Sequence, residues 1–261
     1  MSWDQYKSVA HPTPYVLKFK TARGDLLYFG AAHSNDPLHP QFATISACWE
    51  KLKPTTVLLE GGVPQTANDA SQAIARNGEA GFVGFLAAKS GAKVSALERG
   101  IDAQAAMLEK KFTKVELKLF YTLRQLQQVK REKNPAIGSD WDGWANWWLG
   151  PNGFFNFVPS LKNSPPFNVE ELKSLTKIHF PSLREWHDID DSQFDPRFAD
   201  SLTQRVAREA SDLREPQMVQ TILENLKDGR RVFAIAGASH VVVQEDLLTG
   251  TLGAPIKKYC D

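Results

Sequence analysis

Two short segments of this sequence combine the pattern of a buried strand with a glycine and a histidine in the same arrangement. They read YFGAAH and AIAGASH, and each contains G-x-x-H, at Gly30 to His33 and at Gly237 to His240. A glycine lets the chain turn sharply as it leaves a strand, and small residues keep space open beside the imidazole. Histidine titrates near neutral pH and binds metals through a neutral ring nitrogen, so this pair suits proton transfer or metal ligation.

Two glutamates occupy similar positions at the ends of apolar runs. Glu60 closes the run VLLE, and Glu98 follows SAL in SALERG. A charged group at the end of an apolar strand costs free energy unless it is paired or faces a cleft. A lone histidine at a strand end is more often a hydrogen-bonded structural residue than a catalyst. Two histidines and two glutamates at four strand ends, however, form a candidate active site.

The hydrophobic pattern around these residues predicts alternating strands and helices. YVLKFKT and LLYFG, joined by ARGD, predict a hairpin. TTVLLEGG, AKVSALERG and RVFAIAGASHVV predict three further strands, the last of which ends in the second histidine. Helices are expected over 40–53, 66–76 and 79–89, over FTKVELKLFYTLRQLQQVKRE, and from about Ser201 to Gly229. This order predicts a single α/β domain with a mostly parallel central sheet flanked by helices. Ligands usually gather at the carboxyl ends of such strands.

Residues 134–200 have a different composition, which indicates an insertion or lid within the α/β domain, largely helical or irregular. The segment is rich in Pro, Gly and Phe and holds most of the tryptophans of the chain, namely Trp141, Trp144, Trp147, Trp148 and Trp186. Its aromatic side chains either form a small core packed on the main sheet or line a pocket for an apolar ligand. In the second case Trp144, Trp148 and Phe155 are the candidate substrate-binding residues.

Composition and charge exclude several classes of protein. The 261 residues are 42% hydrophobic and 23% charged, as expected of a globular protein with a sizeable core. The net charge is +1 without a dense Lys/Arg run, so no nucleic-acid partner is expected. No export signal and no apolar run of about 20 residues is visible, so no membrane partner is expected either. Cys48 and Cys260 lie far apart and are expected to be free thiols in a reducing cytoplasm.

The order of the motifs resembles the superfamily that contains the erythromycin esterases, the ChaN-like haem-associated proteins and the TraB/Tiki proteins. GAAHSNDPLHPQF is most similar to the ChaN-like version, whereas LREPQMV and GASH resemble the Tiki and esterase versions at least as much. The central region, 101–200, matches none of them. The residues that carry the resemblance span 26–245 and are Gly30, His33, Glu60, Glu98, Arg99, Arg214, Glu215, Met218, Gly237 and His240.

This resemblance and the strand-end residues together favour a hydrolase of ester or amide bonds. In that hypothesis His33 is the general base on a water molecule, or a ligand to a divalent metal that activates the water. Glu60 orients the histidine or the metal, and His240 is the acid or the second ligand. The expected substrate is an apolar small molecule, a natural product or a peptide. No feature of the sequence indicates an oligomeric state.

Arg214 is the candidate cationic residue of the site. Its guanidinium would hold a substrate carboxylate or stabilise the charge that develops on the carbonyl oxygen. The alternative is an ion pair with Glu215 or Glu209 on the helix surface.

The sequence leaves the cofactor open. The candidate metal ligands are His33, Glu60, His240 and Glu98, with Zn, Mn or Co as the ion, although the local H-E-x-x-H pattern is missing. The Tiki-like members imply a metalloprotease, and the esterase-like members imply a histidine mechanism without metal. The alternative function is a ChaN-like haem- or ligand-binding protein without turnover. There the histidines or Tyr28 would ligate iron, and the Trp-rich region would cover the porphyrin.

Overall fold

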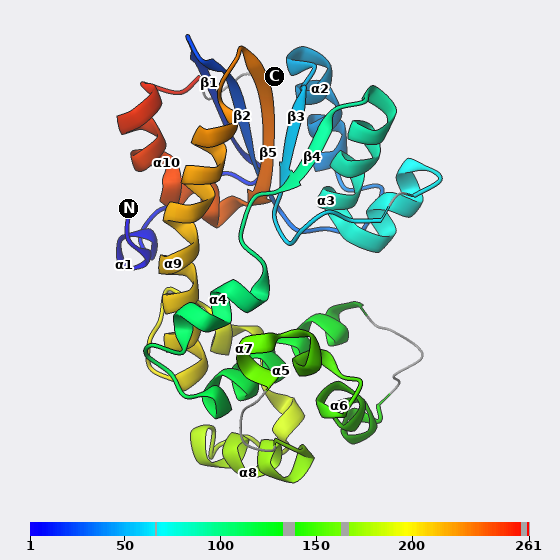
Figure 1. Cartoon of the computed structure of the whole chain (residues 1–261), viewed down its shortest axis with the longest axis vertical. Coiled ribbons are helices and arrows are strands. Elements are labelled where there is room, and N and C mark those ends of the chain that lie inside the picture. The colour runs from blue at the N-terminus through cyan, green and yellow to red at the C-terminus, as the bar shows by residue number, and fades with distance from the viewer. Residues whose placement is uncertain (66, 133–138, 163–166, 257–259, 261) are drawn as a thin grey trace. The chain divides into compact units, whose positions relative to one another are not determined.

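A computed structural model describes residues 1–65, 67–132, 139–162, 167–256 and 260, and Figure 1 shows its elements. The chain divides into two compact units, one formed by Met1–Arg99 with Arg214–Asp261 and the other by Gly100–Leu213. The second unit therefore extends beyond the predicted insertion 134–200 at both ends. Positions 134–138 and 163–166 of that insertion lie outside the described residues.

The first unit is built around a sheet whose described strands have the order β1-β2-β5-β3-β4. β1 pairs antiparallel with β2, as the predicted hairpin requires, and β2, β5, β3 and β4 pair in parallel. The predicted α/β class with a mostly parallel sheet is confirmed. The strand bounds are Tyr15–Thr21 for β1, Gly24–Ala31 for β2, Thr56–Leu59 for β3, Lys93–Ala96 for β4 and Arg230–Gly237 for β5.

Helices cover both faces of this sheet, which explains why the central strands are apolar on both sides. Side chains of α2 and α3 pack with Phe29, Val57 and Phe233 on one face. The part of α9 from Met218 onward packs with α10 and Leu58 on the other face, and Figure 1 shows the two layers. The helices of this unit are α1 (Trp3–Tyr6), α2 (Gln41–Leu52), α3 (Ala70–Ser90), the C-terminal half of α9 (Leu202–Asn225) and α10 (Ala238–Leu252).

The second unit is helical in its described residues and has its own hydrophobic core. Leu119, Leu123 and Leu126 of the long helix α5 are fully buried in that core, as the periodicity of this segment predicts. The elements are α4 (Ile101–Leu108), α5 (Lys114–Glu132), α6 (Trp141–Leu149), α7 (Pro159–Lys162), α8 (Val169–His179), the N-terminal half of α9, and the 3-10 turns η1 (Phe154–Phe157), η2 (Trp186–Asp188) and η3 (Asp191–Phe194).

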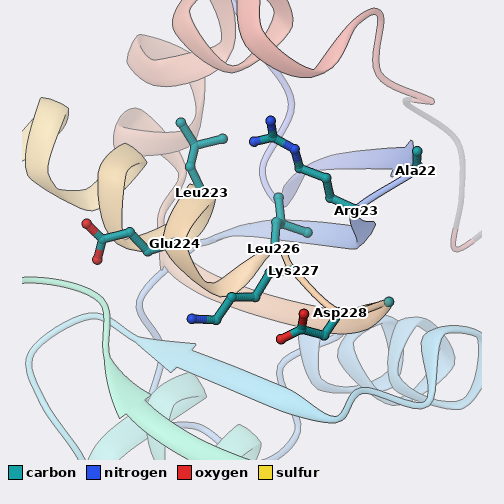
Figure 2. A pocket seen from close by; sticks show the side chains of 8 residues that line it. Ala22, Arg23, Leu223, Glu224, Leu226, Lys227 and Asp228 are labelled. Carbon is teal, nitrogen blue, oxygen red and sulfur yellow. The ribbon is translucent and has the colours of Figure 1, made fainter.

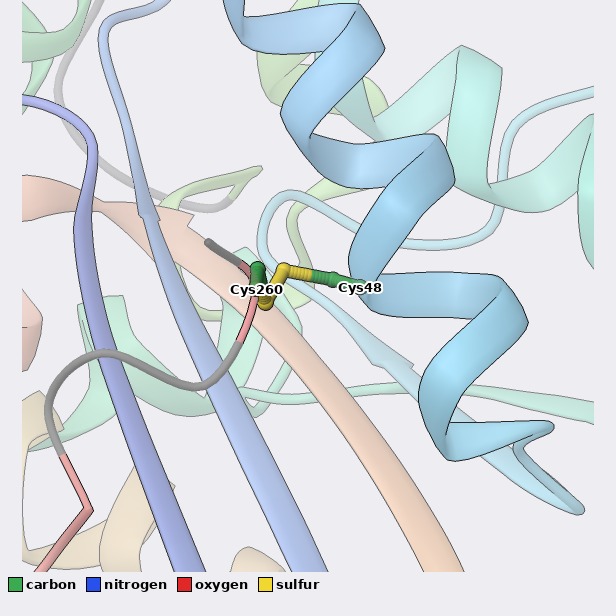
Figure 3. Close-up of a disulfide and its surroundings, with 2 residues drawn as sticks. All are labelled: Cys48 and Cys260. Atoms are coloured by element: carbon green, nitrogen blue, oxygen red, sulfur yellow. A yellow bond between two sulfur atoms is a disulfide. The ribbon is translucent and has the colours of Figure 1, made fainter.

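Cys48 of α2 and Cys260 form a disulfide, shown in Figure 3. The prediction of free thiols is therefore wrong. A separation of 212 residues says nothing about distance in the fold, and the C-terminal segment returns to the sheet by pairing Ile256 with Lys18 of β1. Disulfides persist mainly in oxidising compartments, so the expectation of a reducing cytoplasm loses the observation on which it rested. Within the described part of the chain, the helices are too short or too polar to cross a bilayer.

Candidate functional site

The parallel strands end at one edge of the sheet, and the predicted site residues follow these ends. Ala31 of β2 pairs with Gly237 of β5, and Leu59 of β3 pairs with both Ile235 of β5 and Ala96 of β4. His33, His240, Glu60 and Glu98 therefore follow four neighbouring strands, which we call the carboxyl edge of the sheet. This edge is built from segments that are far apart in the sequence.

The two glycines of the G-x-x-H motifs are required for close packing rather than for a turn. A Cβ atom at Gly30 would lie 2.8 Å from Cα of Ala238 and 2.8 Å from the carbonyl oxygen of Tyr15. A Cβ atom at Gly237 would lie 2.6 Å from Nε2 of His33. The expected reason for these glycines is therefore corrected, since the left-handed conformation near the first motif occurs at His33 itself, with φ +42°. Such a conformation is strained for a residue with a side chain and is often found at functional sites.

His33 is held by a carboxylate that the sequence did not reveal. Nδ1 of His33 lies 2.5 Å from Oε1 of Glu79, whose side chain is almost buried, while 65% of the His33 side chain is exposed. Glu79 follows a kink in α3 at Asn77 and Gly78, where Gly78 has φ +53°. A Cβ atom at Gly78 would lie 2.9 Å from Oδ1 of Asn35, so the kink also lets α3 approach the loop that carries His33. The sequence predicts one helix that ends at 76 and another that starts at 79, with the kink between them. The start of the second helix at Glu79 was the available signal for this residue.

His240 lies in the first turn of α10, not at the end of a strand as predicted, because β5 ends at Gly237. Its Nδ1 lies 2.6 Å from Oε1 of Glu215, and its Nε2 lies 3.4 Å from Oε1 of Glu60. Nη2 of Arg214 lies 3.0 Å from the same Nε2. The imidazole thus has a carboxylate at each ring nitrogen and a guanidinium beside Nε2.

The glutamates of the carboxyl edge also bind its backbone. Oε2 of Glu60 accepts a hydrogen bond of 2.7 Å from the backbone N–H of Gly237. Oε1 of Glu98 accepts one of 3.1 Å from the N–H of Gly61, and its Oε2 lies 3.2 Å from Nη1 of Arg214. These contacts connect the ends of β3, β4 and β5. The partly buried ion pair with Glu98 replaces the surface ion pair with Glu215 or Glu209 that was the alternative for Arg214.

The charges of the cluster raise the pKa of both histidines. Burial lowers the pKa of His240, but the carboxylates of Glu215 and Glu60 outweigh it and raise the pKa to about 10. The hydrogen bond to Glu79 raises the pKa of His33, and the charge of Glu60 adds to this shift. Burial raises the pKa of Glu60, but the charges of His240 and Arg214 outweigh it and hold that pKa well below its usual range.

The protonation of His240 selects the partner of its Nε2. A neutral ring with a proton on Nδ1 accepts a hydrogen bond from Arg214, whereas a charged ring donates from Nε2 to Glu60. The 3.0 Å approach of the guanidinium fits the neutral ring, and the two carboxylates favour the charged ring. The charged ring is the dominant form near neutral pH, because carboxylates contact both of its nitrogens.

Behind His240, a chain of buried hydrogen bonds fixes the orientation of Glu215. The hydroxyl of Tyr28 donates to Oε1 of Gln244 at 3.0 Å, and Nε2 of Gln244 donates to Oε2 of Glu215 at 2.5 Å. Burial and the charge of Glu215 raise the pKa of Tyr28 well above its usual value. A buried, protonated phenol that is bonded to Gln244 is unsuited to ligate iron, so the haem hypothesis loses its tyrosine ligand.

The indole of Trp3 lies edge-on to His240, with ring centroids 6.0 Å apart and an interplanar angle of 88°. Trp3 belongs to the short helix α1, and only 4% of its surface is exposed. The indole of Trp3 therefore covers one edge of the His240 environment and shields it from water. Its position in the sequence, before the first strand, offered no signal for this contact.

The aromatic candidates lie in the second unit. Trp144 and Phe155 are buried in its core, with 5% and 6% of their surface exposed. Trp148 is half-buried and stacks on Phe154 with ring centroids 4.5 Å apart. Trp144 and Phe155 thus pack as expected for a small aromatic core, except that this core belongs to the second unit. Of the three candidates, Trp148 is the most exposed to solvent.

The four candidate metal ligands already have protein partners in this arrangement. The described residues contain no group of three or more His, Cys, Asp or Glu side chains with the geometry of a metal site. Both oxygens of Glu60 and both oxygens of Glu98 already have partners, and the cation of Arg214 lies against Nε2 of His240. A metal ion would have to displace this guanidinium.

The comparisons with known proteins identify no relative. No family model matches the sequence, and no match was found among curated proteins or solved structures. The resemblance to the esterase, ChaN-like and Tiki superfamily therefore stays an expectation. The geometry of the carboxyl edge is the basis for assigning a function.

Proposed function

We propose that this protein hydrolyses ester or amide bonds at the carboxyl edge of its sheet. The observation that carries the proposal is the presence of two histidine–carboxylate pairs at this edge, His33 with Glu79 and His240 with Glu215. In each pair the carboxylate contacts Nδ1, so Nε2 is the nitrogen that exchanges protons with water or substrate. Two such pairs in unlike environments can divide the roles of base and acid.

His33 is assigned as the general base. It is exposed to solvent, and Glu79 makes it a stronger base than an isolated histidine. In the reaction, Nε2 of His33 would take a proton from the attacking water. Glu60 adds a negative charge that stabilises the resulting imidazolium.

His240 is assigned as the general acid. Its pKa of about 10 keeps it protonated at neutral pH, so its Nε2 has a proton to give to the leaving group. Arg214 lies beside Nε2 and adds a positive charge where an oxyanion would develop. Positive charge at this position lowers the free energy of the transition state more than that of the neutral ester or amide.

Exposed apolar side chains near the edge support an apolar substrate. Leu38 follows β2 on the loop that carries His33 and is 89% exposed, and Val63 follows β3 shortly after Glu60 and is 59% exposed. Both residues lie on loops that also carry residues of the proposed site, so an apolar group of the substrate would lie against them. This favours an ester or peptide with an apolar side group.

The test replaces His33 and Glu60 separately by alanine and measures hydrolysis of a panel of apolar esters and peptides. Both variants should fold, as measured by thermal unfolding, and lose at least about two orders of magnitude in rate. Glu60→Gln serves as a second, less disruptive variant, because its side-chain oxygen still accepts from Gly237. His179→Ala, in α8 of the second unit, is the matched histidine control and should keep the parent rate. Full activity of His33→Ala and Glu60→Gln would refute the assignment, and inhibition by a chelator would show that a metal takes part.

A further inference from the structure

The edge of the sheet opposite the candidate site gathers basic residues from four separate parts of the chain. They come from the end of β1 with the β1–β2 turn, and from the three segments in which α2, α3 and α9 end and β3, β4 and β5 begin. Because these strands start at the same edge, the fold brings the four segments together. We call this surface the basic edge, and its residues are Lys20, Arg23, Lys51, Lys53, Lys89, Lys93, Lys227, Arg230 and Arg231.

The acidic residues of the same segments do not balance this charge. They are Asp25, Glu50, Glu224 and Asp228. Asp25 is paired at 2.7 Å with Lys18, which is buried and not part of the basic edge. Asp228 lies 3.8 Å from Arg230. The basic edge therefore keeps a clear excess of positive charge, and all of its basic side chains except the half-buried Arg230 are exposed.

Helix termini explain only part of this arrangement. Lys51 and Lys89 lie in the last turns of α2 and α3, where a cation favours the negative end of the helix dipole. Lys20, Lys93 and Arg231 belong to strands and gain nothing from such a dipole. These three residues add positive charge that the stability of the helices does not explain.

The carboxyl edge has the opposite character. Glu60, Glu79, Glu98 and Glu215 meet there around the histidines. The exposed Asp36 lies on the loop that follows β2. Arg99, Arg214 and the charged His240 offset part of this negative charge, so the first unit has a large positive excess at the basic edge and a small negative excess at the carboxyl edge. Such a charge distribution orients a protein in the field of an anionic surface.

A surface pocket lies within the basic edge and is shown in Figure 2. It is lined by Arg23 of the β1–β2 turn, by Leu223 and Glu224 of α9, and by Leu226, Lys227 and Asp228 of the following connection. A second depression at the same edge includes Lys53 and Arg231. Glu224 and Asp228 balance the two cations of the first pocket, so the positive excess belongs to the basic edge as a whole and not to this pocket.

We propose that the basic edge binds the surface of a membrane that contains anionic phospholipids, with the carboxyl edge directed away from it. An extended array of phosphates matches cations that come from four separate segments at one edge of the sheet. In the described connections, the segments 20–25, 50–55, 89–93 and 226–231 contain no aromatic residue. Trp49 lines the second depression but only 6% of its surface is exposed, so it does not offer a ring for stacking on a base, and nucleic acid fits this surface less well.

The binding experiment measures sedimentation of the full chain with vesicles of phosphatidylcholine, with or without phosphatidylserine. The parent protein should bind the vesicles that contain phosphatidylserine and not the neutral ones, and binding should weaken as salt increases. The double variant Arg23→Glu/Lys227→Glu should lose at least about tenfold in partition coefficient, because each basic residue near such a surface contributes roughly fivefold.

The matched control is Lys110→Glu/Lys162→Glu, two exposed lysines of the second unit that change the net charge by the same amount. It should keep binding within about twofold of the parent. If the first variant fails to unfold cooperatively, Lys20→Glu/Lys93→Glu replaces it. The proposal is overturned if the parent does not bind these vesicles, if both pairs lose binding equally, or if duplex DNA or single-stranded RNA binds in place of the vesicles. The readout needs no catalysis, so it is independent of the hydrolase proposal.

Discussion

Gly237 lies directly against the imidazole of His33, since a Cβ atom at position 237 would be 2.6 Å from Nε2. The residue has φ −56° and ψ 145°, which alanine adopts without strain. Gly237→Ala should therefore displace the ring of His33 while the backbone stays in place. Hydrolysis should fall by about ten- to a hundredfold, because the base is misplaced rather than removed.

Gly250→Ala is the control for this variant. Gly250 lies in α10, the helix that follows Gly237, and a Cβ atom there meets no neighbour within 4 Å. This variant should keep its rate and gain up to about 1 kcal/mol in unfolding free energy, as alanine favours a helix interior. Equal rates for the two variants would show that His33 is not placed by Gly237.

Glu79 should determine the basicity of His33. In Glu79→Gln the charged acceptor at Nδ1 is lost, so the pKa of His33 should fall toward its ordinary value. The measurement is an NMR titration of the His33 ring in the parent and in the variant. An unchanged titration of His33 would mean that Glu79 does not contact it in solution.

The sequence was sufficient to predict the sheet, its hairpin and the four chain segments that meet at the carboxyl edge. Strand ends can be read from an apolar run that stops at a polar residue, and parallel strands bring these ends together. Glu79 and Trp3 were not predicted, because each acts from a helix whose packing against the site depends on tertiary structure. Gln244 lies one turn after His240 in α10, yet nothing in its spacing shows that it orients Glu215.

The disulfide between Cys48 and Cys260 and the basic edge were not predicted, for a related reason. Both depend on residues that are distant in the sequence and adjacent in the fold. Counting charges along the chain shows no basic run, since the cations of the basic edge are distributed over four connections. The last strand was predicted a few residues too long, so that it included His240. The change from strand to helix at Gly237 leaves no break in the apolar pattern.

The stability of the protein should depend on pH through His240. Its pKa is raised to about 10 in the folded state from an ordinary 6.5, so its contribution is complete below about pH 6.5 and is lost as pH rises through 10. Between these values the unfolding free energy of the parent, relative to His240→Gln, should decrease by up to about 1.4 kcal/mol per pH unit. Chemical denaturation at several pH values measures this difference. A difference that stays constant from pH 6.5 to 10 would contradict the raised pKa.

The disulfide should stabilise the first unit. Cys48→Ser opens a loop closed across 212 residues, and loss of such a link costs about 2–5 kcal/mol in unfolding free energy. Thermal unfolding with and without reductant gives the comparison, and reductant should shift the parent but not the variant. Rapid labelling of both thiols in the unreduced parent would show that the link is not formed.

The most direct test of the central claim is a double-mutant cycle between His33 and His240. If the two imidazoles act as base and acid in one site, His33→Ala and His240→Ala should each lower kcat/KM by at least about two orders of magnitude. The double variant should then lose little more than the worse single variant, as residues that act as a unit are not additive. Losses that multiply in the double variant, or a parent-like rate in either single variant, would contradict a shared site.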